Sequence, residues 1–384
     1  MYPSLNSRIS DLSWSPDITS PVSISVPLSV STKLFATTDR RNVALWLGLV
    51  AIVVYLMIVV GGVTRLTQSG LSMVDWQPIM GVIPPITESE WTETFNAYKQ
   101  YPEYQKINAG MSLSEFKGIF YWEYGHRVLG RIIGLIYFVP FVVFLLLGRI
   151  EREFVPRLSI AFVLGGLQGL MGWYMVKSGL VDMPRVSHYR LAAHLLLAML
   201  ILSFLFWLIL DLAGTRRLVV SARMRMLALT MLVLLSLQLL FGAFTAGLDA
   251  GLGFNTYPLM HGQWLHDAAL MIEPVWRNIF ENGVMIQFIH RWLGALMVLG
   301  IVALVVIGFK EGLPKLPLLA LVGVTLTQFF VGIATLLMRV PVGLGSLHQA
   351  VACIMLLALV YIVYITRHAD GLFEKDSSKL TKAV

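Results

Sequence analysis

Eight uncharged, strongly apolar runs divide this chain, and they constrain its fold more than any other feature. They occupy residues 43–63, 132–148, 158–176, 191–210, 226–248, 292–309, 316–338 and 340–366. About 20 residues in a helix span the ~30 Å hydrocarbon core of a bilayer. Charged residues make up 13% of the chain, against roughly 25% in an average soluble domain. We therefore expect an all-α integral membrane protein with eight transmembrane helices.

The second half of the chain repeats the first. Segment 123–130 and segment 287–294 each place a His-Arg pair before an apolar run, and each is followed two runs later by a further histidine, His194 or His348. Segment 61–70 likewise resembles 242–251, and Gln168 and Gln328 stand at matching places in the two halves. Because four crossings preserve orientation, two such units are related by an axis along the membrane normal. The repeat predicts two pseudo-symmetric four-helix bundles.

Four histidines stand at repeat-related positions: His126, His194, His290 and His348. All lie near the beginnings of even-numbered runs, so all should lie at one depth. A lone histidine at a helix end is often an interfacial polar residue, but two matched pairs predict metal or haem ligation between facing helices. Zinc fits poorly because each pair lacks cysteine and further ligands. Haem iron held by two histidines fits better.

Charge and composition divide the chain further. We expect a disordered tail over residues 1–42, a first bundle over 43–213, a linker over 214–225, a second bundle over 226–366 and a tail over 367–384. The net charge of +7 lies on the side of the two tails, which makes them cytoplasmic. A membrane surface explains this charge without nucleic acid. The tail at 1–42 contains acids and no Arg-rich amphipathic helix, which favours a bacterial inner membrane over the mitochondrial alternative.

Three segments carry a resemblance to the haem A synthases: 61–76, 123–131 and 290–294. The resemblance extends from Arg41 to about Arg367, and the lack of loop cysteines matches the cysteine-free class of proteobacteria and mitochondria. It implies oxidation of the ring-position-8 methyl group of haem O to a formyl group by successive hydroxylations, for cytochrome oxidase biogenesis. It also implies a bound haem b cofactor, a haem O synthase (farnesyltransferase) as supplier, and oxidase assembly factors as partners. Whether the chain forms a homo-oligomer stays open.

The two repeats differ in chemical character at one position beside the histidines. Glu123 lies one helical turn before His126 and on the same face, whereas the equivalent residue of the second half is the neutral Gln287. A carboxylate beside a haem can bind a proton, orient water or stabilise positive charge on the macrocycle. We therefore predict that Glu123 is catalytic and that His126 and His194 bind the iron of the substrate haem. The second pair, His290 and His348, is then predicted to hold haem b.

Three arginines accompany the histidines. Arg127 and Arg291 directly follow His126 and His290, and Arg131 lies one turn deeper than Arg127. A guanidinium beside a haem suits a propionate carboxylate, but snorkelling to the membrane surface explains these arginines equally well. The long segment from about residue 65 to 121 carries Trp76 and Trp91. We interpret it as a lid over the first site, with an aromatic belt as the alternative.

Two other classes of protein share these features. A non-catalytic membrane cytochrome b for electron transfer also has eight spans and histidine pairs, but it places its haems at different depths. The single depth of the four histidines argues against it. A haem chaperone for oxidase assembly would bind the same haems and oxidise none of them, and the sequence leaves this class open.

Overall fold

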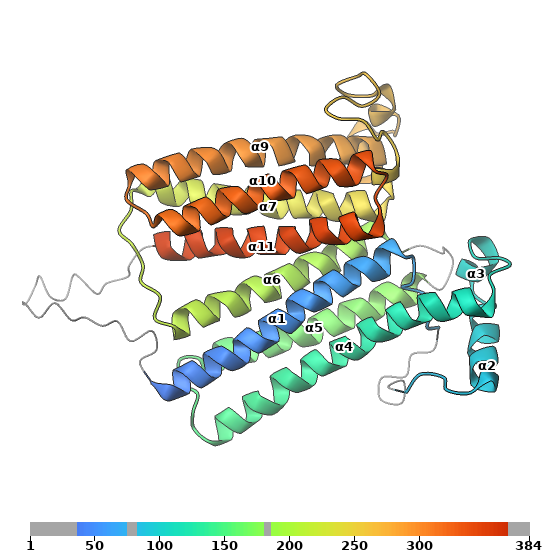
Figure 1. Ribbon diagram of the computed structural model, residues 1–384, viewed down its shortest axis with the longest axis horizontal. Coiled ribbons are helices and arrows are strands. Elements are labelled where there is room, and N and C mark those ends of the chain that lie inside the picture. The colour runs from blue at the N-terminus through green and yellow to red at the C-terminus, as the bar shows by residue number, and fades with distance from the viewer. Residues whose placement is uncertain (1–36, 75–82, 180–185, 368–384) are drawn as a thin grey trace, which may run out of the picture. The chain divides into compact units, whose positions relative to one another are not determined.

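The computed structural model describes residues 37–74, 83–179 and 186–367, which fold almost entirely into helices (Figure 1). Eight of these helices are long and apolar enough to cross a membrane, and this confirms the expected number of spans. They are α1 (Thr38–Leu66), α4 (Leu113–Leu146), α5 (Val155–Gly179), α6 (His188–Leu212), α7 (Ala222–Gly247), α9 (Gly283–Lys310), α10 (Lys315–Leu337) and α11 (Val342–Thr366). The segments expected as tails lie mostly outside the described residues, as does Trp76.

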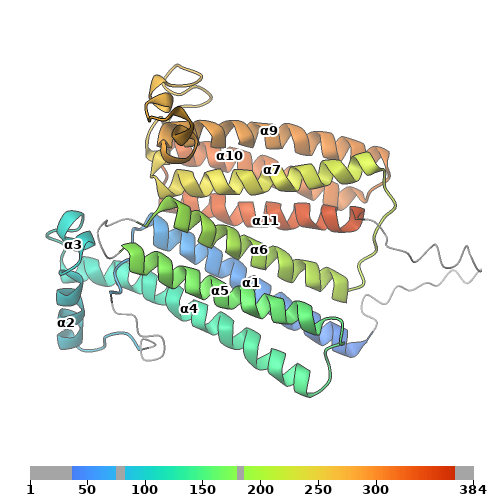
Figure 2. The same cartoon turned by 180° about the vertical axis from the view of Figure 1, so that it is seen from behind.

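Shorter helices occupy the two long connections at one end of the bundle. They are α2 (Glu88–Tyr98), α3 (Pro102–Lys106), α8 (Asn278–Glu281) and the 3₁₀ turns η1 (Ala250–Leu252), η2 (Asp267–Leu270) and η3 (Val275–Arg277). Each of the four histidines lies in the first half of its helix, which is α4, α6, α9 or α11, and these helices begin at the end of the bundle where the connections lie (Figures 1 and 2). We call this end the histidine side.

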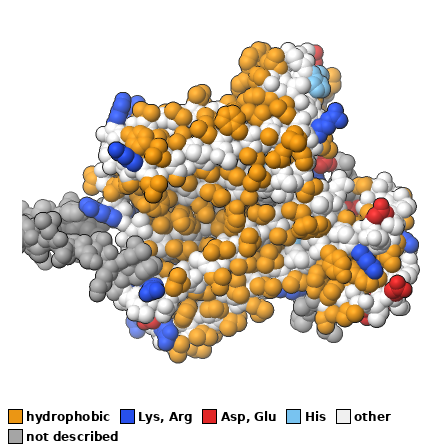
Figure 3. Space-filling model, in the orientation of Figure 1, with side chains coloured by type: hydrophobic (Ala, Val, Ile, Leu, Met, Phe, Trp, Pro, Cys, Tyr) orange, Lys and Arg blue, Asp and Glu red, His pale blue; other side chains and the backbone are white. Residues whose placement is uncertain are grey.

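Six of the eight spanning helices are longer than the uncharged runs that predicted them. Helix α4 begins at Leu113, because Ser112 and Glu115 form a capping box in which each side chain bonds the other's backbone N–H. Its 34 residues correspond to about 50 Å, which exceeds the thickness of a bilayer core. Figure 3 shows hydrophobic side chains along the helices and charged side chains gathered at the two ends. The first turns of α4 therefore extend beyond the apolar band.

A proline inside α4 is compensated by a neighbouring helix. Pro140 lacks an N–H, so it cannot bond the carbonyl of Ile136 four residues earlier. The indole Nε1 of Trp46, on α1, donates to that carbonyl over 2.7 Å. An unsatisfied backbone group in lipid costs several kcal/mol. Trp46 thus stabilises the proline-containing part of α4 and joins it to α1.

Four central helices and two flanking pairs make up the bundle. Helix α11 is the most buried of the spanning helices, since 72% of its most apolar stretch lies inside the protein. Helix α5 is the least buried, with 6%. Helices α4 and α5 pack beside α1 and α6, and α9 and α10 pack beside α7 and α11. The two halves meet where α1 contacts α11, α6 contacts α7, and α6 contacts α11. Each of these contacts between spanning helices therefore has a counterpart between the repeat-equivalent pair.

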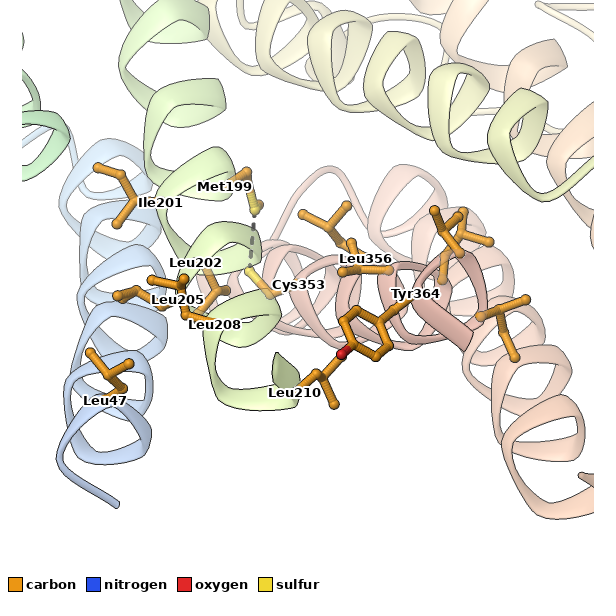
Figure 4. Packing of buried hydrophobic residues seen from close by; sticks show 14 of the residues in the cluster. Leu47, Met199, Ile201, Leu202, Leu205, Leu208, Leu210, Cys353, Leu356 and Tyr364 are labelled. Carbon is orange, nitrogen blue, oxygen red and sulfur yellow. Dashed lines mark hydrogen bonds between the residues drawn. The ribbon is translucent and has the colours of Figure 1, made fainter. Parts of the chain in front are cut away.

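Some residues of the first half contact their own equivalents in the second. Arg65 donates to the carbonyl of Ala246 over 2.8 Å, and these residues match when segment 61–70 is aligned with 242–251. The thiol of Cys353 lies 3.7 Å from the sulfur of Met199 (Figure 4), at the same interval as the second histidines of the two halves. A residue that contacts its own equivalent lies beside any two-fold axis. The superposition of the two bundles stays a prediction, which these contacts support.

Candidate functional site

Each of the four histidine rings packs against a glycine of a neighbouring helix. A Cβ atom added to that glycine would lie between 2.7 and 3.2 Å from the ring, closer than ordinary van der Waals contact. The pairs are Gly61 with His126, Gly172 with His194, Gly242 with His290, and Gly332 with His348. The four glycines are equivalent in the repeat, as the histidines are. The two halves therefore contain the same contact, in which a glycine on one helix leaves space for the imidazole ring of a histidine on the adjacent helix.

Glutamines adjoin three of the histidines. Gln168 Nε2 lies 3.3 Å from His194 Nε2 and donates to its backbone carbonyl over 3.1 Å. Gln328 Nε2 lies 3.3 Å from His348 Nε2, and Gln238 donates to the carbonyl of His290 over 3.0 Å. These contacts fix the helices that carry the histidines without occupying both nitrogens of any ring.

Several ring nitrogens are left for a ligand. Within the part of the chain that the structure describes, the buried Nδ1 atoms of His194, His290 and His348 have no hydrogen-bond partner. A buried polar atom without a partner is costly, and it is often explained by a bound group. The glycine contacts and these nitrogens together fit the axial ligation of a flat iron macrocycle by histidine pairs.

The second-half pair has the spacing that such ligation needs. The ring centroids of His290 and His348 lie 6.3 Å apart, and the planes of the rings are nearly perpendicular at 85°. Imidazole nitrogens bind metals at about 2.0–2.1 Å, so two rings on opposite sides of one metal have centroids about 6 Å apart. In the first half, His126 and His194 lie within electrostatic reach of each other. The structure thus brings together both of the predicted pairs.

Glu123 is held by three donors in a buried position. Its side chain is 3% exposed. One carboxylate oxygen receives the Arg127 guanidinium over 2.5 Å, and the other receives the Ser72 hydroxyl and the Met73 backbone N–H, each over 2.8 Å. Arg127 also donates to the carbonyl of Met73 over 2.9 Å. Glu123 and Arg127 therefore bind the chain segment that follows α1, and we call this arrangement the clamp. It places a negative charge one turn before His126.

The second half repeats this clamp with the polarity of one partner reversed. Arg291 donates to the carbonyl of Phe254 over 2.5 Å, and Phe254 is the repeat equivalent of Met73. Gln287 donates its amide to the carbonyls of Ala250 and Gly253 over 2.9 and 2.8 Å, where Glu123 accepts. Arg127 thus contacts the loop after α1, and Arg291 contacts the loop after α7. Binding of propionates by Arg127, Arg131 and Arg291 stays a prediction.

Helices α2 and α3 pack over the first turns of α4 and form a small cap on the histidine side. We call it the aromatic cap, and its buried residues are Trp91, Phe95, Tyr98, Phe116 and Phe120. A buried carboxyl group lies within it: Glu103 is 6% exposed and accepts from the Tyr98 hydroxyl over 3.1 Å. Trp91 thus belongs to a packed core, as a lid requires. Movement of this cap stays a prediction.

The aromatic cap should loosen as the pH rises. Burial, together with the negative charge of Glu123, raises the pKa of Glu103 from 4.5 to about 7 although the Tyr98 bond opposes this. The folded cap therefore holds a proton that the unfolded segment releases, so its stability falls between pH ~4.5 and ~7, by about 3 kcal/mol, and is constant above. Hydrogen exchange of α2 and α3, corrected for intrinsic rates, measures this.

A matched pair of variants separates this group from general pH effects. Glu103→Gln should remove the pH dependence of exchange protection in α2 and α3, because the amide stays neutral. Glu93, exposed on α2, is the control, and Glu93→Gln should keep that dependence. Equal pH profiles for the parent and Glu103→Gln proteins would show that another group titrates.

Sequence reasoning missed several residues of the site. In the sequence the glycines only mark the repeat. The sequence alone does not show that they face imidazole rings. Ser72 and Met73 bond Glu123 from a distant loop. His188, six residues before His194, bonds the carbonyl of Phe280 over 2.8 Å. A signal for the glycines did exist, because Gly61 and Gly242, like Gly172 and Gly332, occupy matching positions in the repeated segments.

Comparison with known proteins agrees with this geometry. The model of the cytochrome oxidase assembly protein family, COX15-CtaA, matches residues 44–360. The chain is 47% identical over 327 residues to the heme A synthase of Parvibaculum lavamentivorans, which covers 85% of this chain and 94% of that protein. It is 45% identical to the heme A synthase of Nitrosospira multiformis, over 84% and 93% of the two chains. The chain therefore belongs to the cytochrome oxidase assembly protein family.

Proposed function

We propose that this protein is a haem A synthase, an oxidoreductase that converts the ring-position-8 methyl group of haem O to a formyl group. The observation that carries the proposal is the pairing of four histidines with four glycines in repeat-equivalent positions, with a glutamate carboxylate one turn before the first histidine in the first half and a glutamine amide in the second. Two similar haem sites would serve a substrate and a cofactor. The single carboxylate would distinguish the reacting site from the resident one.

The first half is the proposed substrate site. His126 and His194 would bind the iron of haem O, and Glu123 would place its carboxylate near the edge of the ring. Both Glu123 oxygens already accept hydrogen bonds, so accepting a proton would require one of these bonds to be exchanged. The arrangement favours an electrostatic role, in which the carboxylate stabilises positive charge that develops on the macrocycle during oxidation.

The second half is the proposed site of haem b. His290 and His348 would hold it, and the neutral Gln287 would leave no carboxylate beside the ring. Bound haem b would supply one-electron redox chemistry. The glutamines on α7 and α10 orient the helices that carry the two histidines, and the Arg291 clamp encloses the site with the loop after α7.

The proposed location is a bacterial inner membrane, with both termini in the cytoplasm. Support comes from the excess of Lys and Arg on the side opposite the histidines. Haem O would reach the protein from a membrane-bound farnesyltransferase, and the product would pass to factors that assemble cytochrome oxidase. Surrounding lipid would accommodate the farnesyl tail of the substrate.

Haem analysis of the purified protein tests the function. Chromatography and mass spectrometry should detect haem b together with haem O, haem A or a hydroxylated intermediate, and added haem O should be converted. Haem b alone, with no conversion, would indicate a cytochrome b. Unchanged haem O bound beside haem b would indicate a haem chaperone. Either result would overturn the proposal.

A further inference from the structure

A polar contact between the two halves lies directly beside the histidines. Gln349 follows His348 on α11, and its amide donates to the carbonyl of Ile58 on α1 over 2.9 Å. Gly62, one turn further along α1, has no side chain because a Cβ atom there would overlap Gln349 Oε1. The side chain of Gln349 is therefore fitted into a notch on the other half of the protein.

This contact connects the two candidate sites through adjacent residues. Gly61 directly precedes Gly62 on α1, and it faces the ring of His126. On the other side, Gln349 and His348 are neighbours in the chain. Two residues of α1 and two of α11 thus form an unbroken link from the imidazole of the first site to the imidazole of the second.

The repeat-equivalent contact lacks this polarity. Leu195 follows His194 as Gln349 follows His348, and it packs in an apolar cluster with Ala243, the equivalent of Gly62. The fold can therefore close this crossing with apolar side chains alone. A polar group placed among membrane-spanning helices must be compensated by hydrogen bonds, so the presence of an amide at one crossing only requires a reason beyond packing.

We propose that Gln349 is a positioning residue that sets the placement of His348 relative to the first site and thereby the exchange of electrons between the haems bound in the two halves. The inference rests on the proposed function. In that exchange one electron would pass from the ferrous iron of one haem to the ferric iron of the other, and no further reactant would be consumed. Gln349 acts through His348 and through Gly61, without contact to the reacting methyl group.

Gln349→Leu, which copies the other half, is the direct test, and Leu195→Met is its control at the equivalent crossing. In Gln349→Leu we expect a shifted midpoint potential of the second-half haem, slower electron redistribution between the haems after photochemical reduction, and haem release about threefold to tenfold faster, as for one lost interhelical hydrogen bond. Leu195→Met should leave all three unchanged. Unchanged potential and redistribution in haem-replete Gln349→Leu would overturn the inference.

A second route guards against misfolding of that variant. Gly62→Ala keeps Gln349 but displaces it, so it should shift the same potential. The double variant Gly62→Ala with Gln349→Ala relieves the overlap, and it should fold as stably as Gln349→Ala alone. The proposed function and this inference can fail separately. If the parent protein converts no haem O but Gln349→Leu still shifts the midpoint potential of the second-half haem, only the proposed function is overturned.

Discussion

Replacing Glu123 with glutamine should lower the yield of haem A per folded protein by at least about tenfold to a hundredfold, which reaches the low end of the effect of losing a positioned acid or base. The amide keeps the size of the side chain but removes the negative charge beside His126 and the ion pair with Arg127. Haem O or a partly hydroxylated product should accumulate, and chromatography of the extracted haems measures this. Binding of haem O between the first-half histidines should persist.

Glu123 also holds the loop after α1, so a control variant must separate the loss of its charge from movement of that loop. Ser72→Ala removes one hydrogen bond from the same carboxylate and leaves its charge in place, so it should keep most of the activity. An equal loss in both variants would assign the effect to the position of the loop. Capping of α4 does not explain an effect, because Ser112 caps that helix and Glu123 lies about three turns further. A normal haem A yield in Glu123→Gln would remove the catalytic role.

Replacing His290 or His348 with methionine should remove most of the tightly bound haem b or shift its absorption spectrum. Each change deletes one of two axial ligands, which alters the coordination and the potential of the iron. Pyridine haemochrome assays give the haem content, and absorption spectra of the reduced protein show the coordination. Haem A synthesis should fall in parallel, as an indirect effect.

His266 provides the comparison for this pair. It lies in the loop before η2 and accepts from the backbone N–H of Ala268, so His266→Ala should retain the spectrum. If both second-half variants keep their haem b while His126→Met or His194→Met loses it, the cofactor belongs to the first half. The roles assigned to the two sites would then be exchanged.

The eight spans could be predicted from sequence because each is an uncharged run of sufficient length, and the histidine pairs because the repeat marks them. The true start of α4 at Leu113 could not, since charged residues such as Arg127 and Arg131 continue the helix beyond the apolar run. The partners of the site were also hidden. Arg127 meets Met73 and Gln349 meets Ile58 only after the helices pack, and no local pattern encodes such contacts.

The compensation of Pro140 by Trp46 bears on the order in which the protein assembles in its membrane. If α4 entered lipid alone, the carbonyl of Ile136 would face hydrocarbon without a donor. Because α1 is synthesised first, its indole is already available when α4 is inserted. A Trp46→Phe protein should therefore fail early, during insertion of its second span, before any haem site exists. We therefore expect this one indole to matter during biogenesis as well as in the finished fold.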